Sequence, residues 1–97
     1  RRVVSSAPEI AQTKCNLGIS LAYAKQYDEA IRIFRDVIAD NPNYARAYAH
    51  LGETLYKNRA YIESIASLRK ALEFNPADAV TMVNLGNSLH ERGDYDE

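Results

Sequence analysis

Two histidines and one cysteine are the first side chains of this sequence to consider as ligands of a metal ion, and the cysteine is also a candidate nucleophile. Successive members of the set Cys15, His50 and His90 are separated by 35 and 40 residues, and this spacing matches no recognised metal site or catalytic pair. The glycines stand singly within expected helices, so the chain has no glycine-rich loop for a phosphate. We therefore expect no catalytic residue, no metal site and no cofactor, and we expect that the chain is not an enzyme.

The charge balance also limits the partners of this chain. Twelve basic and thirteen acidic residues leave a net charge of -1, so we expect no binding to nucleic acid or to an anionic membrane. The longest apolar runs have four residues, which is too short for a membrane span, and the first residues lack a secretory signal. Cys15 is the single cysteine, which favours a reducing compartment such as the cytoplasm, although the sequence leaves the compartment unknown.

The sequence repeats itself with a period of 34 residues. Residues 11–44 and 45–78 are identical at ten of 34 positions without a gap. The same step relates several sets of three residues: Leu17, Leu51 and Leu85; Gly18, Gly52 and Gly86; Tyr27, Tyr61 and Tyr95. A fixed period of this size predicts a repeat array, in which the repeated tyrosines pack in the core instead of stacking on bases.

Each repeat contains two segments with the periodicity of an amphipathic helix. Apolar or small residues recur at three-and-four spacing along 45–57, called helix A, and along 62–74, called helix B. Pro76 lacks a backbone donor, so we expect it to end helix B and to occupy an early position of the next helix A. The pattern predicts no strand and five helices, at about 9–24, 28–41, 43–58, 62–75 and 77–92.

A glycine in the middle of helix A needs a reason, because it costs about 1 kcal/mol relative to alanine. Gly52 has this position, and its equivalents recur in the other repeats. We expect that the missing Cβ allows helix B to approach closely, with Ala30 or Ser64 facing the glycine of its repeat.

These positions together resemble the tetratricopeptide repeat (TPR). In one repeat the pattern reads Tyr48-x-x-Leu51-Gly52-x-x-Leu55, then Ser64-x-x-x-Leu68, then Pro76. The resemblance implies an all-α helical-hairpin solenoid, a TPR superhelix, with about two and a half repeats plus the tail of a preceding one. One departure is Lys14, which stands where the family usually has a large apolar residue.

The alignment of the repeats also predicts their boundaries. Residues 1–10 align with the end of a helix B, residues 11–44 and 45–78 are full repeats, and residues 79–97 are an incomplete repeat. We therefore expect residues 1–97 to be a fragment of a longer TPR array. Each repeat buries its apolar side against a neighbour, so we expect another chain or further residues to cover Met82, Leu85 and Leu89.

The resemblance implies that consecutive A helices line a concave surface that holds extended peptides or partner helices. The family's contact positions, carried over one repeat at a time, fall on one stripe of each A helix. From this stripe we select as peptide-binding candidates Gln12, Asn16, Ile19, Tyr23, Arg46, His50, Glu53, Tyr56, Lys57, Asn84 and Asn87. The remaining contact positions are Cys15, Ala22, Ala49, Val80, Val83, His90 and Glu91.

Two specialised versions of that surface can be compared with these residues. Cys15, Ile19 and Val80 stand where a clamp for chaperone tails has lysine, asparagine or a basic residue, which argues against such an adaptor. Asn16 and Asn84 share one repeat position, with His50 between them. They resemble the asparagine ladder of the O-linked N-acetylglucosamine transferase, or they reflect a residue that is common at this position.

We therefore expect a non-catalytic scaffold for protein interactions, whose partner is a protein or peptide bound on the concave face of the A helices. Two alternatives stay open. The chain could be the substrate-docking or regulatory TPR arm of a larger enzyme, such as a glycosyltransferase. It could also be a self-assembly module that forms a homo-oligomer through uncapped ends.

Overall fold

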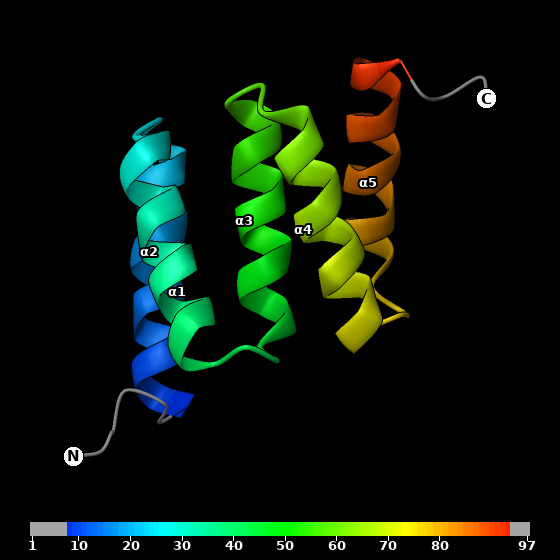
Figure 1. The fold of residues 1–97 in the computed structure, drawn as a ribbon. Helices are drawn as coiled ribbons and strands as arrows, with labels where there is room; N and C mark the ends of the chain where they lie inside the picture. Colours follow the sequence, from blue (N-terminus) through cyan, green and yellow to red (C-terminus); the bar gives the residue numbers. More distant parts are fainter. Residues whose placement is uncertain (1–7, 94–97) are drawn as a thin grey trace.

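The chain folds into five α-helices joined by short turns (Figure 1). The computed structural model describes residues 8–93. Its helices are α1 (Pro8–Tyr23), α2 (Tyr27–Asp40), α3 (Ala45–Lys57), α4 (Tyr61–Phe74) and α5 (Ala79–Arg92). No strand occurs in the part of the chain that the structure describes. The predicted all-α fold is confirmed, and every helix end lies within two residues of its expected place.

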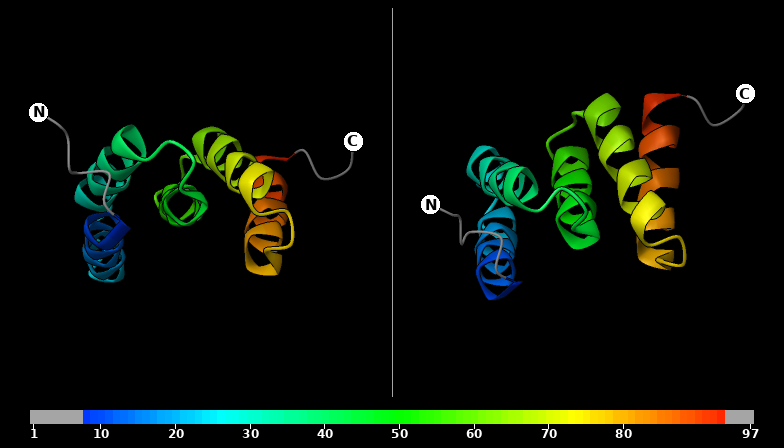
Figure 2. Two further views of the ribbon diagram at one scale, coloured as in Figure 1. Left: turned by 90° about the horizontal axis from the view of Figure 1, so that it is seen from below. Right: turned by 60° about the horizontal axis from the view of Figure 1, so that its bottom comes forward.

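The helices form two layers. The A helices α1, α3 and α5 make one layer and the B helices α2 and α4 the other, as Figure 2 shows in the view along the helix axes. Successive helices run in opposite directions and pack on one another, and α3 also contacts both α1 and α5. This is the helical-hairpin solenoid that the repeat predicts. None of the helices between residues 8 and 93 combines the length and apolar character needed to cross a membrane.

Each A helix is followed by a residue with a left-handed backbone. Lys25 and Arg59 have φ angles of 65° and 67°, and Gly93, at the same repeat position, has 96°. The amide of the residue after Lys25 donates to a carbonyl five residues back at 2.9 Å, and the amide after Arg59 does the same at 2.8 Å. These are the bonds of a Schellman cap, which satisfies the last carbonyls of a helix.

The turn from α4 to α5 shows that the prediction for Pro76 is wrong in one part. α4 ends at Phe74, as expected, but α5 begins only at Ala79, so Pro76 lies in the turn and not in the first turn of α5. Asp78 takes the N-cap position, and its carboxylate accepts a hydrogen bond from the Thr81 amide. A side-chain acceptor at the cap satisfies an orphan amide, so the cap fixes where α5 begins.

The glycine in each of the first two A helices is packed against a large side chain of its B helix. A Cβ on Gly18 would lie 2.7 Å from the Phe34 ring, and one on Gly52 would lie 2.5 Å from Leu68. Phe34 and Leu68 are fully buried. The close approach is therefore confirmed, and the side chain nearest to the missing Cβ lies one helical turn beyond Ala30 and Ser64. Ser64 also contacts the glycine, since its hydroxyl donates to the Gly52 carbonyl oxygen at 2.7 Å.

The outer helices expose the apolar positions that α3 buries. Leu51 is 5% exposed whereas Leu17, its equivalent in α1, is 51% exposed. In α5, Met82 is 49% exposed, Leu85 and Leu89 are half-buried, and nothing lies within 4 Å of a Cβ built on Gly86. The expected cover for this face stays a prediction. The calls on the preceding helix B and on the start of the next one fall largely on residues 1–7 and 94–97, outside the described residues.

The unusual Lys14 is accommodated by a charge on the neighbouring helix. Its Nζ lies 2.9 Å from Oδ2 of Asp36 on α2, and the Lys14 side chain is 34% exposed. The position therefore stays partly solvated and is compatible with a lysine, because the stem packs while the ammonium reaches a carboxylate.

Candidate peptide-binding face

The candidate site is the face that α1, α3 and α5 turn away from the B helices. Figure 2 shows α3 set back between α1 and α5, so this face is concave; we call it the concave face. Two hollows lie on it, one on each side of α3. Residues from the middle of α3, His50 and Glu53, line both.

The hollow between α1 and α3 is small and largely apolar. Its volume of about 30 Å³ has room for about one water molecule. It is lined by Ile19, Ala22, Tyr23, Phe34, His50, Glu53, Thr54 and Lys57. The imidazole of His50 stacks on the Phe34 ring, with 5.9 Å between the centroids and 18° between the planes. The Phe34 ring thus packs both against Gly18 and against the His50 side chain of the concave face.

The hollow between α3 and α5 is larger and has more polar and charged side chains in its lining. Its volume is about 370 Å³, and it is lined by Ala45, Arg46, Ala49, His50, Glu53, Asn75, Asp78, Val80, Thr81 and Asn84. Asp78 is held there by Thr81, whose hydroxyl donates to Oδ2 at 2.6 Å. This bond lowers the pKa of the Asp78 carboxyl, partial burial acts against it, and the Thr81 amide acts in the same direction as the hydroxyl. Asp78 is therefore an anion at neutral pH.

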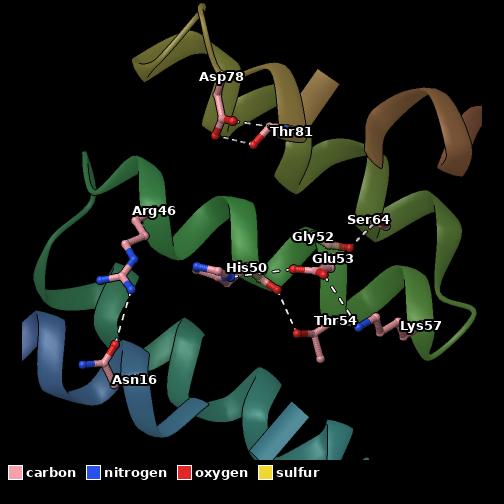
Figure 3. A network of polar contacts seen from close by, with 10 residues as sticks. All are labelled: Asn16, Arg46, His50, Gly52, Glu53, Thr54, Lys57, Ser64, Asp78 and Thr81. Carbon is pink, nitrogen blue, oxygen red and sulfur yellow. Dashed lines mark hydrogen bonds and ion pairs between the residues drawn. The ribbon is translucent and has the colours of Figure 1, made fainter. Parts of the chain in front are cut away.

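Glu53, which lines both hollows, contacts two other side chains of α3, His50 and Lys57 (Figure 3). Oε1 lies 3.7 Å from Nδ1 of His50, and Oε2 lies 3.6 Å from Nζ of Lys57. The contact with His50 is the main cause that lowers the pKa of the Glu53 carboxyl; burial opposes it and Lys57 assists. Nζ of Lys57 also lies 5.7 Å from the centre of the Tyr23 ring on α1. Both carboxylate oxygens of Glu53 are thus engaged within the protein.

Arg46 crosses from α3 to α1. One terminal nitrogen of its guanidinium donates to the side-chain oxygen of Asn16 at 3.3 Å, and Figure 3 shows the arginine turned away from His50 toward that asparagine. Both residues are exposed. The hydrogen bond therefore joins two predicted site residues from neighbouring A helices.

The structure brings most of the predicted site residues together, but not all of them. Five line the first hollow: Ile19, Tyr23, His50, Glu53 and Lys57. Arg46 and Asn84 line the second hollow with His50 and Glu53, and Asn16 joins them through Arg46. Gln12, Tyr56 and Asn87 line neither hollow. The Tyr56 ring is instead 5.7 Å from the ring of Tyr61 at the start of α4.

Cys15, a carried-over contact position, is not available to a ligand. It is 0% exposed, and its burial raises the pKa of the thiol, against a smaller opposite effect of the nearby Arg46 charge. Cys15 therefore behaves as a small core residue. Between residues 8 and 93, no three His, Cys, Asp or Glu side chains are grouped as metal ligands would be.

Several lining residues were missed because they do not belong to helix A. Phe34 comes from α2, and Asn75 and Asp78 come from the turn before α5. Asp78 could have been found from sequence, since an aspartate three residues before Thr81 fits an N-cap. Phe34 gave no such signal, because its position reads only as core.

Comparisons with known proteins identify the family. Two family models, both described as tetratricopeptide repeat, match residues 15–79 and 67–97. The chain belongs to the tetratricopeptide repeat family. A comparison with curated proteins finds no match.

Solved structures support the fold. Two mutants of a protein called MamA superpose on the chain with TM-scores of 0.81 and 0.80, each at 23% sequence identity. They cover 93% and 95% of this chain, and the chain spans 66% and 50% of their lengths. At this identity the likeness concerns the fold. TPR proteins are typically non-catalytic and bind protein partners, and the chain has the architecture of such an interaction scaffold.

Proposed function

We propose that the concave face binds an extended peptide or a helix of a partner protein, and that binding without catalysis is the role of this chain. One observation carries the proposal: residues at equivalent repeat positions of three A helices line two adjoining hollows on one face. We further propose that the repeats are units of 34 residues at 11–44 and 45–78, flanked by parts of others.

The dimensions of a TPR stack suit an extended ligand. Packed helices are about 10 Å apart and an extended peptide advances about 3.3 Å per residue. Successive A helices can therefore contact about every third residue of a bound peptide. An asparagine side chain offers both a donor and an acceptor, which matches the two groups of a peptide backbone. Asn84 in the larger hollow supplies such a pair on α5. The expected ligand is therefore held by its main chain with modest sequence preference.

The test is a selection of binding peptides from a randomised library displayed between two fixed flanks. Peptides of about 12 residues reach about 40 Å when extended, which is enough to cross three A helices. The affinity of the selected peptides is then measured by calorimetry for His50→Ala and Asn84→Ala on the concave face. Arg35→Ala and Lys70→Ala, exposed on α2 and α4, serve as controls.

We expect both concave-face variants to weaken binding severalfold and to stay folded, because neither side chain is fully buried. His50→Ala loses its stack on Phe34, so its melting temperature should fall modestly, whereas that of Asn84→Ala should be nearly unchanged. The outer-face variants should bind as the unmodified chain does. Equal losses in both sets would move the binding surface to the outer face. A library that yields no binder would argue against peptide binding by this chain.

A further inference from the structure

The charged side chains of the concave face differ in how far they are neutralised. Glu53 contacts His50 and Lys57, and Asp78 accepts two hydrogen bonds from Thr81. Arg46 has no carboxylate within ion-pair distance among residues 8–93; its partner is the neutral amide of Asn16. Arg46 and Asp78 thus both lack an opposite charge within ion-pair distance in the described part of the chain, but Asp78 already accepts two hydrogen bonds whereas Arg46 donates one.

Arg46 and Asn16 also have hydrogen-bond donors that the described residues leave unused. A guanidinium has five N–H donors and the Asn16 amide nitrogen has two, whereas the two residues share a single hydrogen bond. The neighbouring stripe of α1, which includes Gln12 and Ile19, contains no acidic residue, and α3 has none in its first turn. Several donors therefore face the ligand side without an acceptor from the described chain.

We propose that Arg46 pairs with the carboxylate of an aspartate or glutamate side chain in the bound peptide. The inference rests on the proposed function and adds the chemistry of the ligand at one position. A guanidinium and a carboxylate form charge-assisted hydrogen bonds, often two in parallel, so this partner uses the free donors best. Glu53 is already paired with Lys57, and two acceptor sites of Asp78 are taken by Thr81, so the largest unused hydrogen-bonding capacity in this hollow is that of the Arg46 guanidinium.

The position of Arg46 in the array identifies the source of the carboxylate. Arg46 lies on α3, the middle of the three A helices, and lines the hollow toward α5 while it reaches toward α1. A peptide that crosses from α1 to α5 passes Arg46 with its interior. The carboxylate is therefore that of a side chain and not that of the peptide's C-terminus.

The experiment uses the 97-residue chain and the same displayed library, whose fixed flanks leave no free carboxyl terminus in the peptide. Selections are run in parallel on the unmodified chain, on Arg46→Gln and on Arg46→Glu. Arg69→Gln, exposed on α4, is the matched control, since it removes one positive charge from the outer face. Melting curves establish that each variant is folded.

We expect one library position to be enriched in Asp or Glu on the unmodified chain and on Arg69→Gln. Arg46→Gln should lose that enrichment, and Arg46→Glu should select Lys or Arg at the same position. For a selected peptide made with an amidated C-terminus, Arg46→Gln should weaken binding about fivefold, and added salt should reduce this difference.

Each other result has a definite meaning. Binders that lack an acidic preference but depend on His50 and Asn84 would overturn the Arg46 inference and leave the proposed function standing. The selected peptide is also made with a free C-terminus. If that form binds more tightly than the amidated form and Arg46→Gln removes the difference, a terminal carboxylate replaces the side-chain carboxylate and the inference as stated is overturned. If no peptide is selected on any variant, the proposed function fails and the inference fails with it.

Discussion

Gly52 and Gly86 occupy the same repeat position in different surroundings. A Cβ on Gly52 would lie 2.5 Å from the Leu68 side chain and 3.3 Å from the Leu68 backbone nitrogen, whereas a Cβ on Gly86 would meet nothing within 4 Å. Both residues lie inside a regular A helix. Within the described residues, the glycine is therefore tightly packed where a B helix lies against it, and we infer that it serves this packing.

The two complete hairpins also differ at one buried position of helix B. In the first, the fully buried Ala30 stands where the second has Ser64. The Ser64 hydroxyl bonds the Gly52 carbonyl and lies 2.9 Å from the hydroxyl of Ser88 on α5. The hairpin therefore forms without a hydroxyl at this position, and in the second hairpin the added group links α4 to the next helix as well.

The largest contrast should come from leucine at the two glycines. Gly52→Leu forces a side chain into a contact that has no room for a Cβ, so we expect a loss of about 3 kcal/mol in the free energy of unfolding. Gly86→Leu enters open space and gains helix propensity, so it should stabilise by up to about 1 kcal/mol. Urea unfolding of both variants checks the signs. Equal losses at both sites would mean that the glycine is required for a reason other than helix B.

Much of this packing, but not its detail, follows from the sequence. The period of 34 residues predicted the hairpins and the close approach at Gly52. Ser64 contacts Gly52 through the carbonyl, as expected, but the side chain closest to the missing Cβ is Leu68, one helical turn further, because the direction of side chains along a helix decides which of them reaches that point. For the site, the resemblance to the TPR family implied that Arg46 and Asn16 lie on the concave face. Their hydrogen bond depends on side-chain reach and rotamer, which the repeat pattern does not specify.

A double-mutant cycle sharpens the assignment of Leu68 as the partner of Gly52. Gly52→Ala should destabilise the unmodified chain, because its Cβ collides with a buried Leu68. In a Leu68→Ala background the side-chain collision is removed and only the 3.3 Å contact with the backbone nitrogen of residue 68 is left, so the same change should cost much less. We expect a coupling of about 1 to 2 kcal/mol between the two sites. Gly86→Ala combined with Leu68→Ala is the control and should show additive effects.

Ser64→Ala tests what the extra hydroxyl contributes to the second hairpin. The change removes the bond to the Gly52 carbonyl and the contact with Ser88, so we expect a loss of about 1 kcal/mol. Because the hydroxyl bridges to α5, amide hydrogen exchange should speed up in α5 more than in α1. Uniform protection loss across all helices would show that the bridge to α5 has no local role.

The smallest expected effect concerns the turn after α3, where Arg59 has a φ of 67° and the equivalent Gly93 has 96°. A left-handed backbone costs a residue with a side chain about 1 kcal/mol, which Arg59→Gly relieves. The glycine also gives the unfolded chain more freedom, at about 0.4 to 1 kcal/mol, so the net gain should be at most about 0.5 kcal/mol.

Asn58→Gly is the matched control for this small gain, because Asn58 lies next to Arg59 with an ordinary φ of -87°. The change there relieves no strain and retains the entropic cost, so it should destabilise by about 0.4 to 1 kcal/mol. The two glycines should therefore shift the urea midpoint in opposite directions at an unchanged m value. A shift in the same direction for both would show that the left-handed turn stores no strain, and that Lys25, Arg59 and Gly93 are equally suited to their common position.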